Sequence, residues 1–220
     1  MAELPKNARD VYTTTDPAED GPRARKHRLT TEVKRMIESV ALLDVHRIDD
    51  DDLLGLIDQA TALADRLEPY PSLREKGGLA LAGGDDAALL ERSGITGRSN
   101  PLAAPLQMWF AGDEVRGSAV YTDAYEGPPG CLHGGFVAAA FDDLLGFAQT
   151  LSGAAGYTGT FTIKYLKPTP LNTELDYAAG VTKAEGRKIW CWGTCHDGAE
   201  LLAEAEILFI TPKHGIPIPR

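Results

Sequence analysis

Two adjacent glycines follow a histidine at the start of the most apolar segment of this chain. The three residues are His133, Gly134 and Gly135, and the segment 134–151 is dominated by Ala, Leu and Phe. Such a segment is typical of a buried helix, because it is apolar on nearly every side. Glycines at a helix start leave backbone N–H groups bare, and the helix dipole favours negative charge there. The pattern predicts that Gly135 or Gly134 donates to a carbonyl oxygen that gains negative charge.

A carboxylate follows on the same predicted helix. Asp142 lies seven residues after Gly135, which returns it to nearly the same helix face but about 10 Å further along the axis. One helix therefore cannot easily present both groups to one carbonyl. Two such helices, paired antiparallel across a two-fold axis, would bring the glycines of one chain against Asp142 of the other. The spacing predicts a homodimer with two identical composite sites.

The neighbours of Asp142 are mostly apolar. Phe141, Leu144 and Leu145 surround it in sequence, so we expect the carboxylate to be buried, where an unpaired charge is costly and usually functional. Asp143 is the alternative reactive group if the register differs. We interpret Asp143 instead as a hydrogen-bonding or surface partner.

Residues 127–135, followed by Asp142, resemble the signature of PaaI-type hotdog thioesterases, which include mammalian thioesterase superfamily members that hydrolyse fatty acyl-CoA. In that family a His-Gly-Gly opens the central helix, a carboxylate lies nine positions after the His, and a hydroxyl residue begins the next strand. Those places hold His133, Asp142 and Thr158 in this chain. The resemblance runs from about residue 125 to 212, and the combination is more specific than the glycine pair alone.

The resemblance implies hydrolysis of an acyl-CoA thioester to a free carboxylic acid and coenzyme A. Asp142 would act as a nucleophile or as a general base on water, and both roles need an ionised carboxylate in a shielded pocket. Thr158 would orient the water or the carboxylate, and His133 would fix the loop or help to polarise the carbonyl. The resemblance also implies a homodimer or a dimer of dimers, with no metal and no cofactor besides the coenzyme A of the substrate.

Coenzyme A carries several negative charges and needs cations even on an acidic protein. Lys164 and Lys167 are candidates to hold its phosphates, and the alternative is that both are ordinary solvated strand lysines. A second basic cluster precedes the motif and is interpreted as a solvated helix face. This cluster consists of Arg23, Arg25, Lys26, Arg28, Lys34 and Arg35.

The basic cluster motivates an alternative function, an acyl-CoA-binding regulatory protein with a hotdog sensor domain and no hydrolysis. Its N-terminal helices would contact DNA or a protein partner. The net charge of -10 argues against nucleic acid, because phosphate neutralisation needs a surplus of Lys and Arg. A regulator also has no need of the carboxylate at position 142.

Composition narrows the class of protein. The chain has 220 residues, 43% hydrophobic and 25% charged, which suits one globular domain with an extension. It has neither an apolar run of the ~20 residues that cross a bilayer nor the sections of a signal peptide, so we expect a cytoplasmic protein without a membrane partner. The three cysteines include no CxxC pair, which indicates reduced thiols and no zinc site.

The chain divides into three predicted parts. Residues 1–22 are polar and are expected to be disordered, residues 23–104 form a helical extension and connector, and residues 105–220 form the hotdog domain. Apolar residues at helical spacing predict a first helix from Thr30. The run of acidic residues 49–52 is interpreted as a helix cap and not as a metal site.

Period-two patterns dominate after residue 105. Strands are predicted on both sides of the apolar helix, with a short helix near 87–92 ahead of them and hairpin turns at Glu185-Gly186 and Asp197-Gly198. An antiparallel sheet must cover its apolar face, and one long buried helix does so. The predicted fold class is α+β, a hotdog fold in which an antiparallel sheet wraps around a long central helix.

Overall fold

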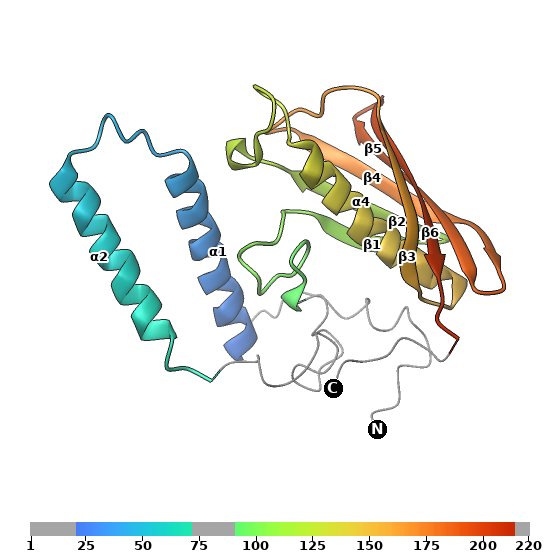
Figure 1. The fold of residues 1–220 in the computed structure, drawn as a ribbon, viewed down its shortest axis with the longest axis horizontal. Helices are drawn as coiled ribbons and strands as arrows, with labels where there is room; N and C mark the ends of the chain where they lie inside the picture. Colours follow the sequence, from blue (N-terminus) through green and yellow to red (C-terminus); the bar gives the residue numbers. More distant parts are fainter. Residues whose placement is uncertain (1–20, 72–90, 214–220) are drawn as a thin grey trace.

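The computed structural model describes residues 21–71 and 91–213. Its centre is an antiparallel sheet with strand order β1-β2-β4-β5-β6-β3, and helix α4 (Gly134–Ala148) lies across one face of this sheet (Figure 1). The arrangement confirms the predicted sheet wrapped around a central helix. The strands are β1 (Gln107–Ala111), β2 (Glu114–Val120), β3 (Tyr157–Tyr165), β4 (Glu174–Glu185), β5 (Lys188–Asp197) and β6 (Glu200–Ile210).

The core lies between α4 and the sheet. Phe141, Leu144 and Leu145 of α4 have no exposed surface, and burial of such side chains contributes about 1.5–3 kcal/mol each. Gly193 of β5 permits the close approach of the helix, because a Cβ there would lie 3.2 Å from the ring of Phe141. The small residue in the strand therefore sets how closely α4 packs.

Both predicted hairpin turns are present. Gly186 connects β4 to β5 with φ 59°, and Gly198 connects β5 to β6 with φ 53°. These are left-handed conformations that favour glycine. The predicted helix 134–151 is too long by one turn, because the chain tightens into the 3-10 helix η5 (Gln149–Ser152) and then turns at Gly153 with φ 78°.

Strand β3 forms one edge of the sheet and pairs with β6. Its two ends are tied to α4. The hydroxyl of Tyr165 donates to the carbonyl oxygen of Gly134 at 3.0 Å, and the N–H of Gly156, just before β3, donates to Oε1 of Gln149 at 2.7 Å. The free edge of the sheet therefore runs beside the central helix, antiparallel to it.

Helices α1 (Gly21–Ala41) and α2 (Asp50–Leu67) stand to one side of the sheet (Figure 1). Oδ1 of Asp49 accepts from the N–H of Asp52 at 2.8 Å, which confirms the predicted cap. Within the described residues, no group of three or more metal-ligating side chains is gathered. The same part of the chain contains no helix that is long and apolar enough to cross a bilayer.

Helix α1 begins earlier than predicted. The expectation of disorder to residue 22 is wrong for Gly21 and Pro22, and the expected helix start at Thr30 is nine residues late. Proline is tolerated in the first turn, and the Arg, Lys and Ala residues that follow are strong helix formers although they give no apolar stripe. Residues 1–20 lie outside the described residues, as does most of the predicted short helix at 87–92, of which 91–92 are helical.

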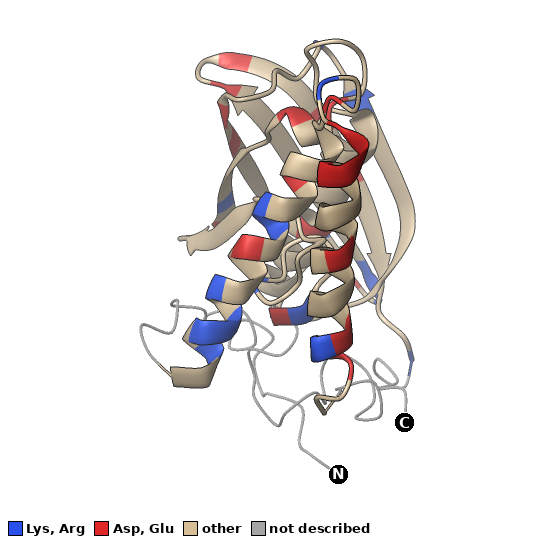
Figure 2. Cartoon of the chain, turned by 90° about the vertical axis from the view of Figure 1, so that its left-hand side faces the viewer, with Lys and Arg blue, Asp and Glu red and all other residues tan. Residues whose placement is uncertain are grey.

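The N-terminal helices differ in charge, with Lys and Arg gathered on the first half of α1 and Asp residues along α2 (Figure 2). The predicted solvated face is confirmed for the basic cluster except Lys34, which is half-buried. Helix α1 is held to the connector by His27, whose Nε2 lies 2.8 Å from Oε2 of Glu91. Burial alone would raise the pKa of Glu91, but hydrogen bonds from Ser99 and His27 outweigh it and lower that pKa.

Candidate active site

The side chain of His133 caps the N-terminus of α4. His133 has extended backbone angles (φ -61°, ψ 130°) and serves as the N-cap, and its Nδ1 accepts the N–H of Gly135 at 3.0 Å. An accepting Nδ1 leaves the proton of the neutral ring on Nε2. The first backbone hydrogen bond of the helix runs from the N–H of Phe136 to the carbonyl oxygen of His133 at 2.9 Å. Among the described residues no acceptor faces the N–H of Gly134, so this is the open amide of the pair.

A cavity of ≈ 380 Å³ lies against this helix start. Its walls are mostly apolar and come from the loop before α4, from α4 itself and from the end of β3 with the loop that follows. They include Cys131, Leu132, Gly134, Val137, Tyr165 and Lys167. A concave apolar site with one convergent donor is the usual form of a small-molecule site. Cys131 and Tyr165 are wall residues that sequence reasoning missed, since neither belongs to a spacing pattern that carries chemistry.

Asp142 is exposed in the single chain, so the predicted burial of its carboxylate is wrong for one protomer. The apolar neighbours Phe141, Leu144 and Leu145 are buried against the sheet. Consecutive helical residues are about 100° apart, and Asp142 therefore turns away from that face. Partial burial nevertheless raises its pKa above 3.8.

Asp143, the neighbour of Asp142, is held by hydrogen bonds within the chain. Its Oδ2 accepts hydrogen bonds from the hydroxyls of Thr96 at 2.6 Å and Ser93 at 3.0 Å. Burial raises the pKa of Asp143, and the two hydrogen bonds partly offset that effect. The predicted hydrogen-bonding role is confirmed, and these contacts fasten the connector to the outer side of α4.

Thr158 lies near the start of the edge strand. It is exposed and stands opposite Phe209 of β6, where a register shift follows between Thr158 and Thr160. Neither Thr158 nor Asp142 is among the residues that line the cavity at Gly134. One chain therefore brings His133, Gly134 and Gly135 together and leaves the predicted carboxylate and hydroxyl outside that group.

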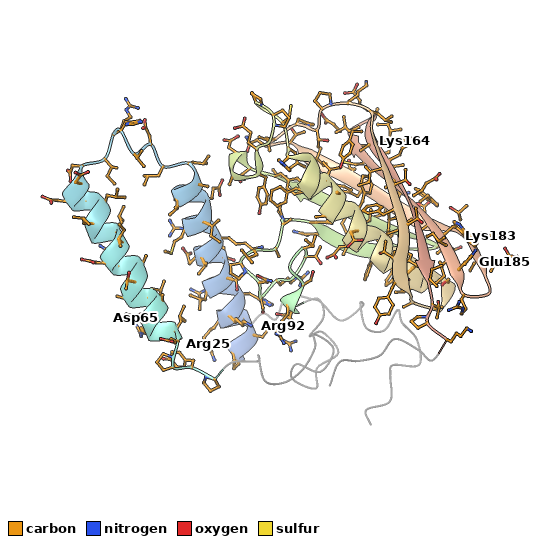
Figure 3. The ribbon with its side chains drawn as sticks, in the orientation of Figure 1. Arg25, Asp65, Arg92, Lys164, Lys183 and Glu185 are labelled. Carbon is orange, nitrogen blue, oxygen red and sulfur yellow. The ribbon has the colours of Figure 1, made fainter. Side chains whose placement is uncertain are left out.

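The two candidate phosphate-binding lysines already have carboxylate neighbours. Lys164, labelled on the outer side of the sheet in Figure 3, donates to Glu204 at 2.7 Å, and the hydrogen bond and charge of Glu204 raise its pKa. Lys167 pairs with Glu200. Of the two lysines, only Lys167 lines the cavity, so it is the better placed to meet a ligand there.

The sequence matches no protein-family profile. The crystal structure of protein RHA08564, a thioesterase superfamily protein, superposes on this chain with a TM-score of 0.75 and 26% identity, over 89% of this chain and 97% of that one. This chain is a hotdog-fold protein of the thioesterase superfamily. The predicted resemblance is confirmed at the level of the superfamily and the fold.

Two further relatives resemble parts of this hotdog protein. Acyl-coenzyme A thioesterase THEM4 of Xenopus laevis is 37% identical over 87 residues, which are 39% of each chain. The match thus spans about two-fifths of the frog protein. The crystal structure of smu.793 from Streptococcus mutans, bound to acetyl CoA, has a TM-score of 0.46 and 22% identity over 49% of this chain and 90% of that one.

Proposed function

We propose that this hotdog protein hydrolyses an acyl-CoA thioester to a carboxylic acid and coenzyme A, as a PaaI-type enzyme. The observation that carries the proposal is the N–H of Gly134, which has no acceptor among the described residues and belongs to a residue that lines an apolar cavity. The 37% identity to a frog acyl-coenzyme A thioesterase supports the same substrate class. Thioester hydrolysis places negative charge on the carbonyl oxygen, and one preorganised donor to that oxygen contributes about 3 kcal/mol to lowering the barrier.

Asp142 supplies the basic group. As a general base it takes a proton from water while the water oxygen bonds to the thioester carbon; the C–S bond then breaks, and the proton passes to the sulfur of coenzyme A. As a nucleophile its oxygen displaces coenzyme A directly, and water then hydrolyses the acyl anhydride. Either role needs an ionised and freely directed carboxylate. The exposed Asp142 suits this better than Asp143, whose Oδ2 already accepts two hydrogen bonds.

The site is proposed to form between two chains. Strand β3 is a nine-residue edge strand, and the side chains at its two ends, Tyr157 and Tyr165, are 52% and 54% exposed. An open edge of this length is normally covered. Antiparallel pairing of β3 with its symmetry mate would continue the sheet and bring the α4 helices together. The Gly134 amide of one protomer would then face Asp142 of its partner, and the pairing would bury that carboxylate further.

The remaining predicted residues have supporting roles in this proposal. His133 holds the first turn of α4 through Gly135, which fixes the direction of the Gly134 N–H. Thr158 orients the water or the partner carboxylate from the strand edge. Lys167 meets a phosphate of coenzyme A from the cavity wall, and Lys164 gives a weaker contact outside it. A cytoplasmic location and a role in fatty acid metabolism stay predictions.

Thiol release from a panel of acyl-CoAs tests the proposal directly. The wild-type chain should release free coenzyme A, and Asp142→Asn should abolish this release. The matched variant Asp58→Asn changes an exposed residue of α2 and should not affect the release.

The effect of Asp142 on stability serves as the control. Because its folded pKa is raised, Asp142 contributes most to the free energy of unfolding below pH 3.8 and less as the pH rises through the raised value. Asp142→Asn should therefore not lower the free energy of unfolding at pH 7. Activity that survives in Asp142→Asn would remove the proposed mechanism.

A further inference from the structure

Two other cavities lie where α1 packs against the hotdog domain. Their volumes are ≈ 520 Å³ and ≈ 330 Å³, and both are lined by Lys34 of α1 and by Pro105, the first residue of the hotdog domain. Neither includes Asp142 or Gly134. Their walls also include residues of the hotdog domain, such as Met108 of β1 and Phe136 of α4, but the proposed hydrolysis does not use these cavities.

The larger cavity is cationic. Lys34 and Arg98 line it together with the polar side chains of Thr96 and Gln107, and none of its lining residues is acidic. Apolar groups, among them Phe147 of α4, complete its wall. Lys34 is half-buried in this lining, whereas Arg98 is exposed. The cavity favours an anionic group beside Lys34, because a charge that is partly removed from water is stabilised by pairing.

Lys34 is the cation common to both cavities. Its side chain is half-buried, in contrast to Lys26 and Arg35, which are exposed on the same helix. Burial lowers the pKa of Lys34, which means that its charged form is poorly solvated. Among the described residues it has no carboxylate within ion-pair distance. An entering anion would supply the missing partner.

The smaller cavity is mostly apolar. Its wall includes Ile37, Leu102, Tyr125 and Phe136, and its acidic lining residue is Glu38. Burial, followed by the charge of Glu38, raises the pKa of Tyr125, which places Glu38 near that ring. A carboxylate on this side would be repelled by Glu38. The smaller cavity therefore suits a hydrocarbon chain, and the larger one suits its charged end.

We propose that the two cavities together bind an amphipathic carboxylate, such as a medium-chain free fatty acid. The carboxylate pairs with Lys34 beside Arg98 in the larger cavity, and the alkyl chain lies in the smaller cavity between α1 and the domain. The ligand would join α1 to the hotdog domain. Its contacts would involve α1, the connector, β1, β2 and α4. None of these contacts is with Gly134 or Asp142, so binding needs neither coenzyme A nor hydrolysis.

Calorimetric titration of the full-length protein with octanoate, in the absence of coenzyme A, tests this site. Octanoate should bind the wild-type protein, and Lys34→Met should weaken binding about tenfold or more, as expected for loss of a charge-assisted hydrogen bond. Lys34→Arg should retain most of the affinity because it keeps the cation. Lys26→Met, which removes an exposed cation of α1, should leave affinity unchanged. Octan-1-ol should bind more weakly than octanoate.

Three results would overturn the proposal: no binding of octanoate, equal binding of octanoate and octan-1-ol, or unchanged affinity in Lys34→Met. Circular dichroism verifies that Lys34→Met retains its helices. If it does not, Lys34→Gln replaces it, with the same expected loss of affinity. These titrations are independent of catalysis, so loss of thioesterase activity in the panel assay leaves their outcome unaffected.

Discussion

The backbone N–H of Gly135 donates to Nδ1 of His133 at 3.0 Å, so the imidazole closes the first turn of α4 from within the chain. The sequence alone does not tell which of Gly134 and Gly135 donates to the substrate, and this contact distinguishes them. The Gly135 amide has an acceptor already, whereas Gly134 lines the cavity and its N–H has no acceptor among the described residues. In our account Gly135 shapes the helix start, and Gly134 polarises the thioester carbonyl.

Replacement of His133 should reveal whether its role is the cap or a direct contact with substrate. His133→Ala removes the acceptor for the Gly135 N–H and should lower the free energy of unfolding by about 0.5–2 kcal/mol, the usual range for loss of an N-cap. His133→Asn supplies a favoured N-cap side chain and should restore most of that stability. Urea denaturation of the two variants measures the difference.

The same pair of variants separates the roles in catalysis. If His133 acts as a cap, His133→Asn should also recover kcat for acyl-CoA hydrolysis, because the Gly134 amide is again directed at the carbonyl. Recovery of stability without recovery of kcat would assign the imidazole a contact with the reacting group.

Asp143→Ala should destabilise the fold, in contrast to Asp142→Asn. The substitution leaves the hydroxyls of Thr96 and Ser93 without their acceptor, which should lower the free energy of unfolding by about 1–3 kcal/mol. Thr96→Ala should cost less in the Asp143→Ala background than in the wild type, since the shared hydrogen bond is already lost. Additive costs in the double variant would argue against this contact.

The pH dependence of hydrolysis should report the carboxylate. The ionised form of Asp142 is the reactive one, so kcat/KM should fall as the pH drops through its pKa. Partial burial raises that pKa, and the midpoint of the acid limb should therefore lie above 3.8. Rates at each pH need a parallel check that the protein remains folded. A limb with its midpoint at or below 3.8 would be inconsistent with Asp142 as the titrating group.

Substrate binding should slow the alkylation of Cys131. It lines the cavity at Gly134, whereas Cys191 and Cys195 are buried, and burial raises the pKa of Cys195 to about 11. Iodoacetamide should therefore alkylate Cys131 first in the native protein. A non-hydrolysable acyl-CoA thioether should slow that reaction. Mass spectrometry measures the alkylation of each cysteine, and unchanged alkylation of Cys131 at saturating ligand would place the substrate elsewhere.

Local patterns predicted most of the fold. The acidic run at Asp49 is a cap because its side chain reaches only three residues ahead, and Glu185-Gly186 is a turn because glycine accepts the left-handed angle. The apolar pattern predicts too late a start for helix α1, because the first turns of this helix are basic rather than apolar. Periodicity locates an amphipathic helix by its apolar face, and Gly21 begins a helical segment without such a face.

The candidate site was predictable in its residues but not in its contacts. A helix that is apolar on nearly every side gives no sign of which side meets the sheet, so the exposure of Asp142 could not be predicted from Phe141 and Leu144. The bond from Thr96 to Asp143 spans 47 residues and depends on tertiary packing. Lys34 lies within a cluster of similar cations, and its half-burial follows from the position of α1.

The shared site makes a direct prediction for a mixed dimer. Gly134→Pro removes the open N–H at the first helical position, where proline is tolerated, and His133 at ψ 130° already has the conformation that precedes proline. By itself this variant should lose about 10²–10³-fold in kcat, whereas Gly134→Ala, which meets only ordinary contacts with Tyr165, should lose far less. Asp142→Ala by itself should be inactive.

The most direct measurement of the central claim is the acyl-CoA hydrolysis rate of a heterodimer that carries Gly134→Pro in one chain and Asp142→Ala in the other, purified through a different tag on each. One of its two composite sites contains both native groups, so the heterodimer should recover about half of the wild-type rate. A heterodimer as inactive as Asp142→Ala alone would contradict the account, because it would mean that the amide and the carboxylate must come from the same chain.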